Sequence, residues 1–505
     1  MDTSDHLGRD QSDGVGEPIS FFPDSALALD IAINETSRLR QIAARIRADD
    51  PHIWGTFGSR TRSGILPTRC VFIGDTREIA LARPNAETTF EYRLSLLARA
   101  GDLVVFSGAP NSAFEAYRSD YLSRGPICPV TPRLDESNPL KPLADRCRLD
   151  PDVISYLSDV ARQDGGLTIV PHISLGAVWR LAAELSERAS VDVCVAGPPP
   201  VLTERVNDKL WFSRFAVTIL GRDSIAPTYS AHSFASLVGR VRKLTHEAGR
   251  LVVKIPDSAG GLGIVCFAPH EFERTSLLAV KDQIKTVLHT LGWRGTFPLL
   301  IGLWEAPAVC SPSAQLWIPL PPCGSPILEG IFEQRLEGRQ GIFVGCMPTK
   351  LPDRWQMQMA QEAIALATVL QGLGYYGRCS LDAIIIGPDL DHGRLHWIEC
   401  NGRWGGVSIP LSLVRQLAYP RKPKFVVIQR TEGVQTPRPF ARVVAALDPL
   451  LYRRGTRDQG IVLLSPCEAE AGLGIQMLAM GATLDVAERI STQSLATLFG
   501  NNAYS

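Results

Sequence analysis

The segment from residue 375 to residue 416, YYGRCSLDAIIIGPDLDHGRLHWIECNGRWGGVSIPLSLVRQ, restricts the fold more than any other part of this chain. Two apolar runs, LDAIII and LHWIEC, flank a connection rich in Pro, Asp and Gly, and this pattern favours a β-hairpin. Asp382 opens the first predicted strand and Glu399 closes the second. Pairing of the two strands therefore brings the two carboxylates side by side.

Two further polar residues continue the second predicted strand. Asn401 and Arg403 follow Glu399 at alternate positions, and alternate side chains of a strand share one face. Asp382, Glu399 and Asn401 would then present three oxygen donors, the kind of ligand that Mg²⁺ prefers. Arg403 adds a planar cation that fits carboxylate or phosphate oxygens. The simpler alternative is an amphipathic hairpin with two solvated acids.

Bulk composition excludes several classes of protein. At 505 residues the chain is long enough for two or three domains with conventional cores. A formal net charge of zero argues against nucleic acid or an anionic membrane surface as a partner. The 11 cysteines include no C-x-x-C pair, which indicates neither a zinc site nor a disulfide framework and fits the cytoplasm. Without a long apolar run or an apolar leader, we expect no membrane span, and we expect residues 1–20 to be disordered.

The N-terminal part of the chain predicts an open α/β layer structure. Short apolar runs that end in small or acidic residues are typical of buried parallel strands, and helical patterns lie between them. No G-x-G-x-x-G follows any of these strands, so the sequence carries no dinucleotide-binding fingerprint. The predicted strands are 70–75, 102–108 and 191–197, and the predicted helices are 25–48, 112–123, 151–163 and 176–189.

Two lysines stand at positions that suit an anion. Lys209 lies in the first turn of a helix predicted to end at Leu220 with Asn207 as its cap, where a cation opposes the helix macrodipole. Lys254 ends the strand LVVK and precedes DSAGGLG, whose glycines let backbone N–H groups approach phosphate oxygens. The loop has no G-K-[ST] and is not a Walker A motif. The alternatives are a solvated Lys209 and a glycine loop that is only a turn.

The remaining segments carry weaker signals. TFPLLIGLWEAP contains an apolar strand with Glu305 at its end. Residues 325–335 and 340–348 form a predicted hairpin, in which Glu329 and Glu333 are interpreted as structural or solvent-facing. After the acidic hairpin, Ser408 is predicted to cap a short helix. The sequence after residue 419 predicts an α+β extension with a strand in GLGIQMLAMG and a helix over 484–498.

The order of lysine, strand, glycine loop, strand and acidic hairpin resembles the ATP-grasp superfamily. More narrowly, NDKLWF, SPSAQLWIP and HWIECNGRWGG resemble the pheganomycin-type peptide ligases. This resemblance covers about residues 201–416 and implies an α/β and α+β fold. It divides the chain into a pre-ATP-grasp α/β domain (21–200), a small ATP-grasp subdomain (201–298), a large subdomain with the metal site (299–419) and a C-terminal α+β extension (420–505).

The resemblance also implies residue roles. Mg²⁺, or Mn²⁺, is held by Asp382, Glu399 and Asn401, while Arg403 and Lys254 act in catalysis. Many ATP-grasp ligases have an Arg two residues before the metal-binding Asp; Ser380 stands there in this chain, and Arg378 is the predicted substitute. The residues implied in ATP binding are Lys209, Lys254, Ser258, Gly260, Gly261 and Gly263 for the phosphates, Leu303 and Trp304 within the 303–306 backbone for adenine, and Glu305 for ribose.

The implied activity is ATP-dependent ligation of an amino-acid or peptide carboxylate to an amine through an acylphosphate, with release of ADP and phosphate. Both substrates are then small molecules or peptides, and homodimer formation is left open. Two alternatives remain at this point. A phosphotransferase on the same scaffold would stop after phosphate transfer, and a non-catalytic module would bind ATP without turnover.

Overall fold

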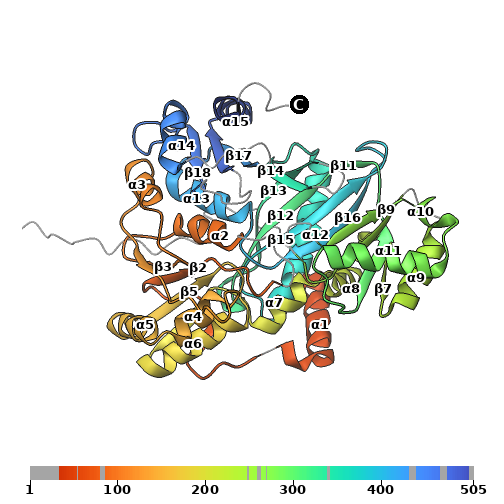
Figure 1. Cartoon of the computed structure of the whole chain (residues 1–505), viewed down its shortest axis with the longest axis horizontal. Coiled ribbons are helices and arrows are strands. Elements are labelled where there is room, and N and C mark those ends of the chain that lie inside the picture. Colours follow the sequence, from red (N-terminus) through yellow and green to blue (C-terminus); the bar gives the residue numbers. More distant parts are fainter. Residues whose placement is uncertain are drawn as a thin grey trace, which may run out of the picture.

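The computed structural model of the chain describes residues 33–53, 55–79, 86–246, 250–258, 263–268, 270–337, 342–430, 439–466 and 475–499. The strands in these ranges form three sheets, of six, four and nine strands, in order along the chain (Figure 1). The first sheet with its helices is an α/β unit and the other two are α+β, as the sequence predicts. No helix among the described residues is both long enough and apolar enough to cross a membrane.

The first sheet is entirely parallel, with the strand order β1-β6-β5-β2-β3-β4. The central strands β2 and β3 are apolar on both faces because helices cover both sides. In β2, Val71 and Ile73 pack in one core with α4, α5 and α6, whereas Cys70 and Phe72 pack in the opposite core with α2 and α3. The three predicted strands are confirmed as β2, β3 and β6. The bounds are β1 (Thr61–Ser63), β2 (Cys70–Ile73), β3 (Leu103–Val105), β4 (Cys128–Val130), β5 (Gly166–Pro171), β6 (Asp192–Val195), α2 (Ala86–Ser95), α3 (Ser112–Asp120), α4 (Leu143–Leu149), α5 (Pro151–Asp164) and α6 (Gly176–Ala189).

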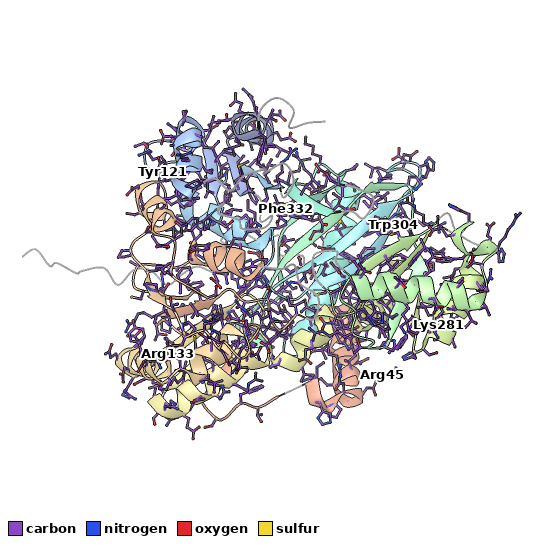
Figure 2. All side chains as sticks on the ribbon, viewed as in Figure 1. Arg45, Tyr121, Arg133, Lys281, Trp304 and Phe332 are labelled. Carbon is purple, nitrogen blue, oxygen red and sulfur yellow. The ribbon has the colours of Figure 1, made fainter. Side chains whose placement is uncertain are left out.

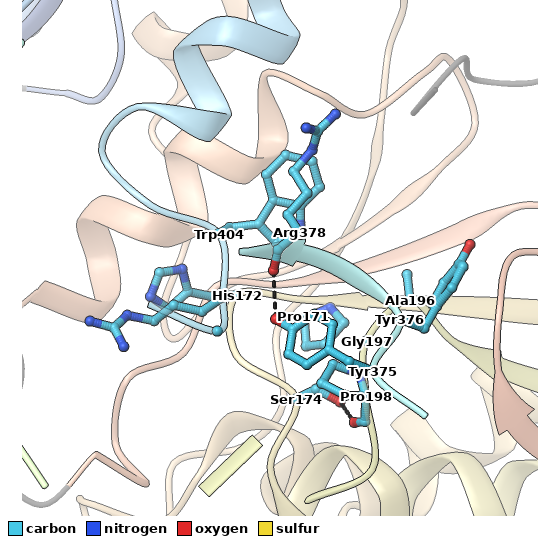
Figure 3. A pocket seen from close by; sticks show the side chains of 12 residues that line it. Pro171, His172, Ser174, Ala196, Gly197, Pro198, Tyr375, Tyr376, Arg378 and Trp404 are labelled. Carbon is cyan, nitrogen blue, oxygen red and sulfur yellow. Dashed lines mark hydrogen bonds between the residues drawn. The ribbon is translucent and has the colours of Figure 1, made fainter. Parts of the chain in front are cut away.

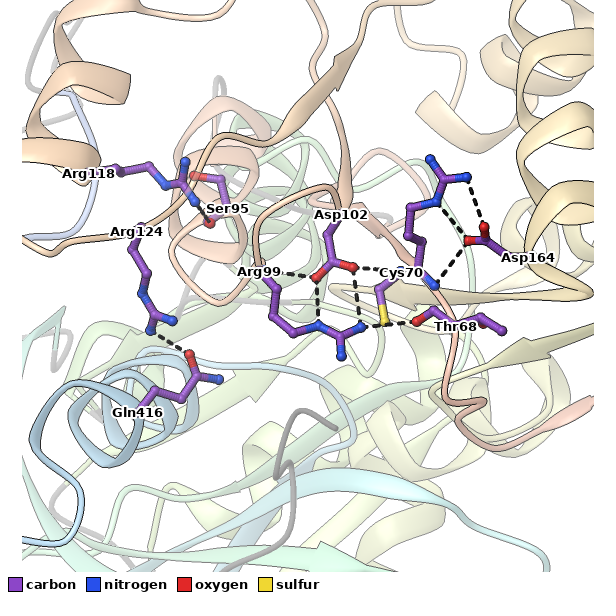
Figure 4. A network of polar contacts seen from close by, with 10 residues as sticks. Thr68, Cys70, Ser95, Arg99, Asp102, Arg118, Arg124, Asp164 and Gln416 are labelled. Carbon is purple, nitrogen blue, oxygen red and sulfur yellow. Dashed lines mark hydrogen bonds and ion pairs between the residues drawn. The ribbon is translucent and has the colours of Figure 1, made fainter. Parts of the chain in front are cut away.

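A buried carboxylate fixes the start of two strands in this sheet (Figure 4). Asp102, only 1% exposed, accepts hydrogen bonds from the backbone N–H groups of Cys70 at 2.9 Å and Arg99 at 2.8 Å. The Arg99 guanidinium lies 3.3 Å from the same carboxylate. Nearby, Arg124 donates to Gln416 at 2.5 Å and joins this layer to α13 (Ser408–Ala418). These contacts tie the first sheet to the C-terminal half of the chain.

Two consecutive helices, α7 and α8, lead from the first sheet to the second. Asp208 separates them and caps α8, because its carboxylate accepts a hydrogen bond from Trp211 N at 2.8 Å. The prediction that Asn207 is the cap is wrong, since Asn207 is the last residue of α7. The predicted N-terminal helix is confirmed from Ile33 onward, and its first residues lie outside the described ranges. The bounds are α1 (Ile33–Asp49), η1 (Pro51–Ile53), α7 (Pro200–Asn207), α8 (Lys209–Leu220) and η2 (Arg222–Ser224).

The second sheet is antiparallel, with the order β7-β10-β8-β9, and α9 and α11 pack against it. Figure 1 shows it as the green unit beside the long strands of the third sheet. Trp304 lies where the chain passes from this sheet to the third (Figure 2). The bounds are β7 (Thr228–Ala231), α9 (Phe234–Leu244), β8 (Leu251–Lys254), β9 (Ile264–Phe267), α10 (His270–Glu273), α11 (Leu277–Thr290) and β10 (Leu299–Leu303).

The third sheet is antiparallel and follows the order β11-β15-β12-β13-β14-β17-β19-β18, with β16 paired to β15. The predicted hairpins are β13–β14 and β15–β16, and the predicted C-terminal strand and helix are β19 and α15. The strands after residue 420 extend this same sheet, because β17 pairs with β14. The bounds are β11 (Ala308–Cys310), β12 (Pro312–Ile318), η3 (Pro321–Cys323), β13 (Ile327–Glu337), β14 (Ile342–Pro348), α12 (Asp353–Gly372), β15 (Gly377–Ile386), β16 (Arg394–Asn401), β17 (Lys424–Arg430), α14 (Phe440–Leu447), η4 (Asp448–Leu450), β18 (Gly460–Leu463), β19 (Ile475–Gly481) and α15 (Leu484–Phe499).

Candidate active site

The acidic hairpin has the register that the sequence predicts. Asp382 of β15 lies directly opposite Glu399 of β16, and Ser380 lies opposite Asn401. Cross-strand partners share a face of the sheet, so the two carboxylates lie side by side. The register shifts immediately after Asp382, at a β-bulge. One detail of the prediction is wrong: Asp382 lies in the interior of β15, which begins at Gly377.

Asp382 is held by short hydrogen bonds in a crowded acidic environment. Its carboxylate accepts from Ser313 Oγ at 2.6 Å and from Asn401 Nδ2 at 2.9 Å. Burial and the charge of Glu399 raise the pKa of Asp382 to about 6. The two carboxylates therefore repel each other, and the hydrogen bonds offset this repulsion only in part.

Lys209 joins Glu399 to the glycine loop. It is the first residue of α8 and is 5% exposed. Its Nζ lies 3.0 Å from Glu399 Oε2 and donates hydrogen bonds to Ser258 O at 2.9 Å and Ser258 Oγ at 3.3 Å. Burial alone would raise the pKa of Glu399, but Lys209, Arg403 and Lys254 lower it below its usual value. Glu399 is therefore the anion that accounts for a lysine at a helix N-terminus.

Lys254 lies close to the same charges. Its pKa is lowered by burial and by Lys209, while Glu399 and Glu305 act in the opposite direction. Lys254 ends β8, opposite Ile264 of β9. Glu399 thus interacts with both lysines, and Asp382 lies beside it on the acidic hairpin.

Part of the glycine loop can be described. Ile255 N donates to Gly263 O at 2.8 Å, and Ser258 Oγ donates to Ile255 O at 2.9 Å. A Cβ atom on Gly263 would lie 2.5 Å from the Cβ of Ser258, so the close approach of the two ends of the loop requires glycine. Gly260 and Gly261, two of the predicted phosphate-binding residues, lie outside the described residues.

The segment predicted to bind the nucleoside leaves the second sheet at Leu303, which pairs with Leu251. Trp304 N donates to Arg250 O at 2.9 Å, so one of the backbone donors proposed for adenine is already used. Glu305 Oε2 lies 2.7 Å from Nδ1 of His396 on β16. The sequence analysis did not identify His396, because the contact joins segments 91 residues apart.

Arg403 is positioned by two asparagines. It donates to Asn401 Oδ1 at 2.5 Å and to Asn207 Oδ1. Asn207 Oδ1 also accepts from Gly402 N at 3.2 Å. Asn207 therefore holds the turn after β16 instead of capping a helix. Ser408 likewise does not cap α13; it is the first residue of that helix, and its Oγ accepts from Gly405 N at 2.8 Å.

Arg378 has a different environment from the other predicted catalytic residues. It is 5% exposed and forms an ion pair with Glu329, which also pairs with Arg415. Its guanidinium lies over the rings of Trp404 at 4.9 Å and Trp317 at 5.3 Å. Burial and the charge of Arg415 lower the pKa of Arg378 to about 9. Glu329 is accordingly structural, and its side chain does not face solvent.

A recess lies between the first sheet and the acidic hairpin (Figure 3). Its walls include His172, Arg378, Arg403 and Trp404. His172 follows β5, and its N–H donates to the carbonyl of Ile73 at the end of β2, at 2.8 Å. Strand order reverses between β2 and β5, and the crevice at such a switch point is where open α/β sheets bind ligands. Sequence reasoning missed His172 and Trp404.

The metal-ligand set contains few protein ligands. Within the described residues, no group of three or more His, Cys, Asp or Glu side chains is arranged to hold a metal ion. The predicted set has two carboxylates and one amide, so a bound cation would need further oxygen ligands from substrate or water. Every cysteine in the described ranges is a free thiol.

Residues 91–186 match the family described as the pre ATP-grasp domain. The chain also aligns with solved structures over most of its length. The biotin carboxylase domain dimer of Hydrogenobacter thermophilus 2-oxoglutarate carboxylase, in complex with MgADP, ADP and bicarbonate, is 15% identical over 85% of this chain and 90% of that chain, with a TM-score of 0.51. This protein has an ATP-grasp-type fold.

A second ATP-grasp-type structure gives the same result. Biotin carboxylase from Campylobacter jejuni, in complex with β,γ-ATP, is 11% identical over 85% of this chain and 91% of that chain, with a TM-score of 0.52. Identities this low establish the fold alone. No curated protein sequence matches the chain.

Proposed function

We propose that this protein is an ATP-dependent ligase that joins an amino-acid or peptide carboxylate to an amine, with chemistry like that of the pheganomycin-type peptide ligases. The observation that carries the proposal is the meeting of Asp382 and Glu399 with Lys209 and Lys254 at the junction of two sheets. Two acids suit a divalent cation and two lysines suit phosphates, which are the needs of a site for a metal–nucleotide complex. The ADP and ATP complexes of the biotin carboxylase structures support this choice of ligand.

The residues present fit Mg²⁺. Asp382 and Glu399 are adjacent anions, and Asn401 adds an amide oxygen that now accepts from Arg403. Mg²⁺ is commonly held by one or two carboxylates together with substrate phosphates, and Mn²⁺ accepts the same ligands. When bound, the cation would neutralise charge on the transferred phosphoryl group. We propose Asp382, Glu399 and Asn401 as its protein ligands.

The residues present also fit ATP. Lys209 is buried and Lys254 half-buried, and Glu399 interacts with both cations, an arrangement that a polyphosphate stabilises. Ser258 and Gly263 bring the ends of the loop within reach of Lys209. We propose that these residues hold the phosphates, that backbone groups of 303–306 other than the Trp304 N–H contact adenine, and that Glu305 binds ribose.

Arg403 lies between the acidic hairpin and the recess and is the residue best placed to orient the acid substrate. It touches Asn401 and lines the recess. In the proposed reaction a carboxylate oxygen attacks the γ-phosphorus and ADP leaves. The amine nitrogen then attacks the acyl carbon, phosphate leaves, and the amine loses a proton. The two arginines of the recess, Arg403 and Arg378, balance the negative charge of the acid and of the acylphosphate.

The test is a screen of amino acids and short peptides for release of ADP and phosphate, with product masses. We expect release that requires both an acid and an amine, and a product with the summed mass of both less one water. ADP release without an amine, together with a stable phosphorylated acid, would instead identify a phosphotransferase. ATP binding without any substrate-dependent turnover would identify a binding module. Either result contradicts the proposal.

Two variants test the site itself. Glu399→Ala and Lys254→Ala should each abolish ATP turnover and leave the fold intact, because each removes a charge that faces the nucleotide. Matched controls are Asp391→Ala in the turn of the same hairpin and Lys243→Ala on the exposed face of α9. Near-normal turnover in Glu399→Ala or Lys254→Ala would refute the residue assignment.

A further inference from the structure

Among the described residues, Arg93 is a buried arginine with neither a carboxylate nor a hydrogen-bond partner. Arg93, in the last turn of α2, is 2% exposed. Its Nε and Nη2 atoms are enclosed and have no hydrogen-bond acceptor in the described part of the chain. A buried guanidinium normally has a carboxylate or carbonyl partner, because desolvation of the charge costs several kcal/mol. Arg118 in the neighbouring helix is as buried but pairs with Glu115 at 2.7 Å.

A second unsatisfied group lies beside Arg93. The ring of Phe90 stacks on His172, with centroids 3.8 Å apart, and the Arg93 guanidinium lies 5.5 Å from the centroid of the same ring. Nδ1 of His172 is enclosed and has no hydrogen-bond partner in the described residues. The buried nitrogen atoms of Arg93 and His172, whose side chains both contact the Phe90 ring, thus both lack a hydrogen-bond partner among the described residues. Native structures leave few such groups unsatisfied, and one explanation is an absent ligand.

His172 connects Arg93 to the recess. It is one of the walls of that recess, together with Arg403 and Trp404 (Figure 3). The carbonyl of His172 accepts a hydrogen bond from Trp404 N at 3.0 Å. Burial, Arg403 and Arg93 together hold the pKa of His172 well below its usual value, so the ring is neutral. His172 therefore lines the recess and also stacks on the Phe90 ring, which Arg93 contacts.

We infer that Arg93 and His172 form a binding site for a second anionic group, a carboxylate or phosphate, on the acid whose reacting carboxylate lies beside Arg403. Guanidinium forks match the planar or tetrahedral oxyanion geometry of these groups. In the described part of the chain no acidic side chain forms an ion pair with Arg93, so the ligand would supply the negative charge that balances its guanidinium. The identity of the ligand as the acid substrate rests on the proposed function, whereas the anion site itself does not.

Thermal stability tests the anion site without catalysis. The full-length wild type, Arg93→Met and the control Arg118→Met are unfolded in MgADP, with added glutarate, inorganic phosphate or neutral glutaramide. Arg93→Met should melt at a higher temperature than the wild type without added anion, because it removes an uncompensated buried charge. Glutarate, phosphate or both should raise the melting temperature of the wild type and of Arg118→Met, but not that of Arg93→Met.

The anion that stabilises the wild type distinguishes a carboxylate from a phosphate. The inference is overturned if neither anion raises the melting temperature of the wild type, which would mean that water alone satisfies Arg93. It is equally overturned if Arg93→Met responds to the anions as the wild type does, or if Arg93→Met melts at a lower temperature than the wild type without any anion.

Kinetics tests the identity of the ligand. With an acid found by the ligase screen, Arg93→Met should raise KM for the acid roughly tenfold or more, leave KM for ATP unchanged, and keep kcat within about threefold. Arg93→Lys should recover part of this loss. In the wild type an acid whose second anionic group is capped as an amide should have a higher KM than the uncapped acid, and in Arg93→Met the two KM values should be alike. An equal fall in kcat for every acid would overturn the assignment to the substrate. Absence of ligase activity in the wild type would contradict the proposed function, and the thermal test would still decide whether the anion site exists.

Discussion

Replacement of Lys209 by methionine tests the connection between the acidic hairpin and the glycine loop. Lys209→Met keeps the apolar stem of the side chain and removes the ammonium group that lies 3.0 Å from Glu399 Oε2. At an effective dielectric constant of about 20, two charges at this distance attract by about 5–6 kcal/mol before desolvation is counted. Loss of one partner of a buried pair costs about 3–5 kcal/mol.

The exposure of the partner reduces this value. The Glu399 side chain is 27% exposed, so water screens part of the attraction and about 2 kcal/mol is expected from the ion pair. Two hydrogen bonds to Ser258 are also lost, at about 1 kcal/mol or less each. We therefore expect Lys209→Met to lower the free energy of unfolding by about 3 kcal/mol.

The assay is urea unfolding at pH 7.5 in EDTA, at constant ionic strength. A double-mutant cycle with Glu399→Gln should give a coupling energy of about 2 kcal/mol. Mg²⁺ should restore more stability to Lys209→Met than to the wild type, because the cation replaces the missing charge beside the carboxylates. Lys243→Met on the exposed face of α9 is the control and should lose less than about 0.5 kcal/mol. A loss below about 1 kcal/mol for Lys209→Met, or a coupling energy near zero, would refute the reasoning.

Three further predictions concern other parts of the molecule. Gly263→Ala should lower kcat/KM for ATP roughly tenfold or more, because the added Cβ would lie 2.5 Å from the Cβ of Ser258. The second substitution Ser258→Gly, made in the same chain, should restore part of the loss. Steady-state kinetics of ADP release measures both effects. Glu329→Gln should lower the free energy of unfolding by about 3–5 kcal/mol in urea, because it leaves Arg378 and Arg415 without their shared counter-ion; a loss below about 1 kcal/mol would contradict the buried ion pair. Burial raises the pKa of Glu91 from 4.5 to about 7, so its contribution to stability is complete below about pH 4.5 and is lost as the pH rises through about 7. Between pH 5.5 and pH 8 the free energy of unfolding in urea should therefore fall by about 2 kcal/mol more for the wild type than for Glu91→Gln, and equal pH dependence of the two would contradict it.

Local patterns predicted much of the fold. The buried strands β2, β3 and β6 could be predicted from short apolar runs, because both faces of a parallel sheet are covered and such strands are mostly apolar. The hairpin with Asp382 and Glu399 could be read from alternation and a turn-rich connection, both of which act over a few residues. Helix ends were less predictable: Asp208, not Asn207, caps α8, since either residue type can serve and only the backbone path selects one.

The partners of the site residues depended on tertiary structure. Asn207 accepts a hydrogen bond from Gly402 across 195 residues because α7 packs beside the end of β16, and Glu305 contacts His396 across 91 residues because the segment after β10 lies beside β16. The burial of Glu329 between Arg378 and Arg415 could not be predicted either. Alternation shows that Glu329 and Glu333 share one face of their strand, but not whether that face is buried or solvated.

The amino-acid sequence by itself determined which short segments become strands and helices and which charged side chains occupy the ends and faces of those segments. These properties follow from backbone periodicity and turn chemistry within about ten residues. Only the tertiary structure decided which charges meet. It placed Lys209 beside Glu399, paired Arg378 with Glu329, and buried Arg93 with no counter-ion among the described residues. The physical reason is that burial and charge pairing depend on how sheets distant in sequence pack against one another, which no local pattern records.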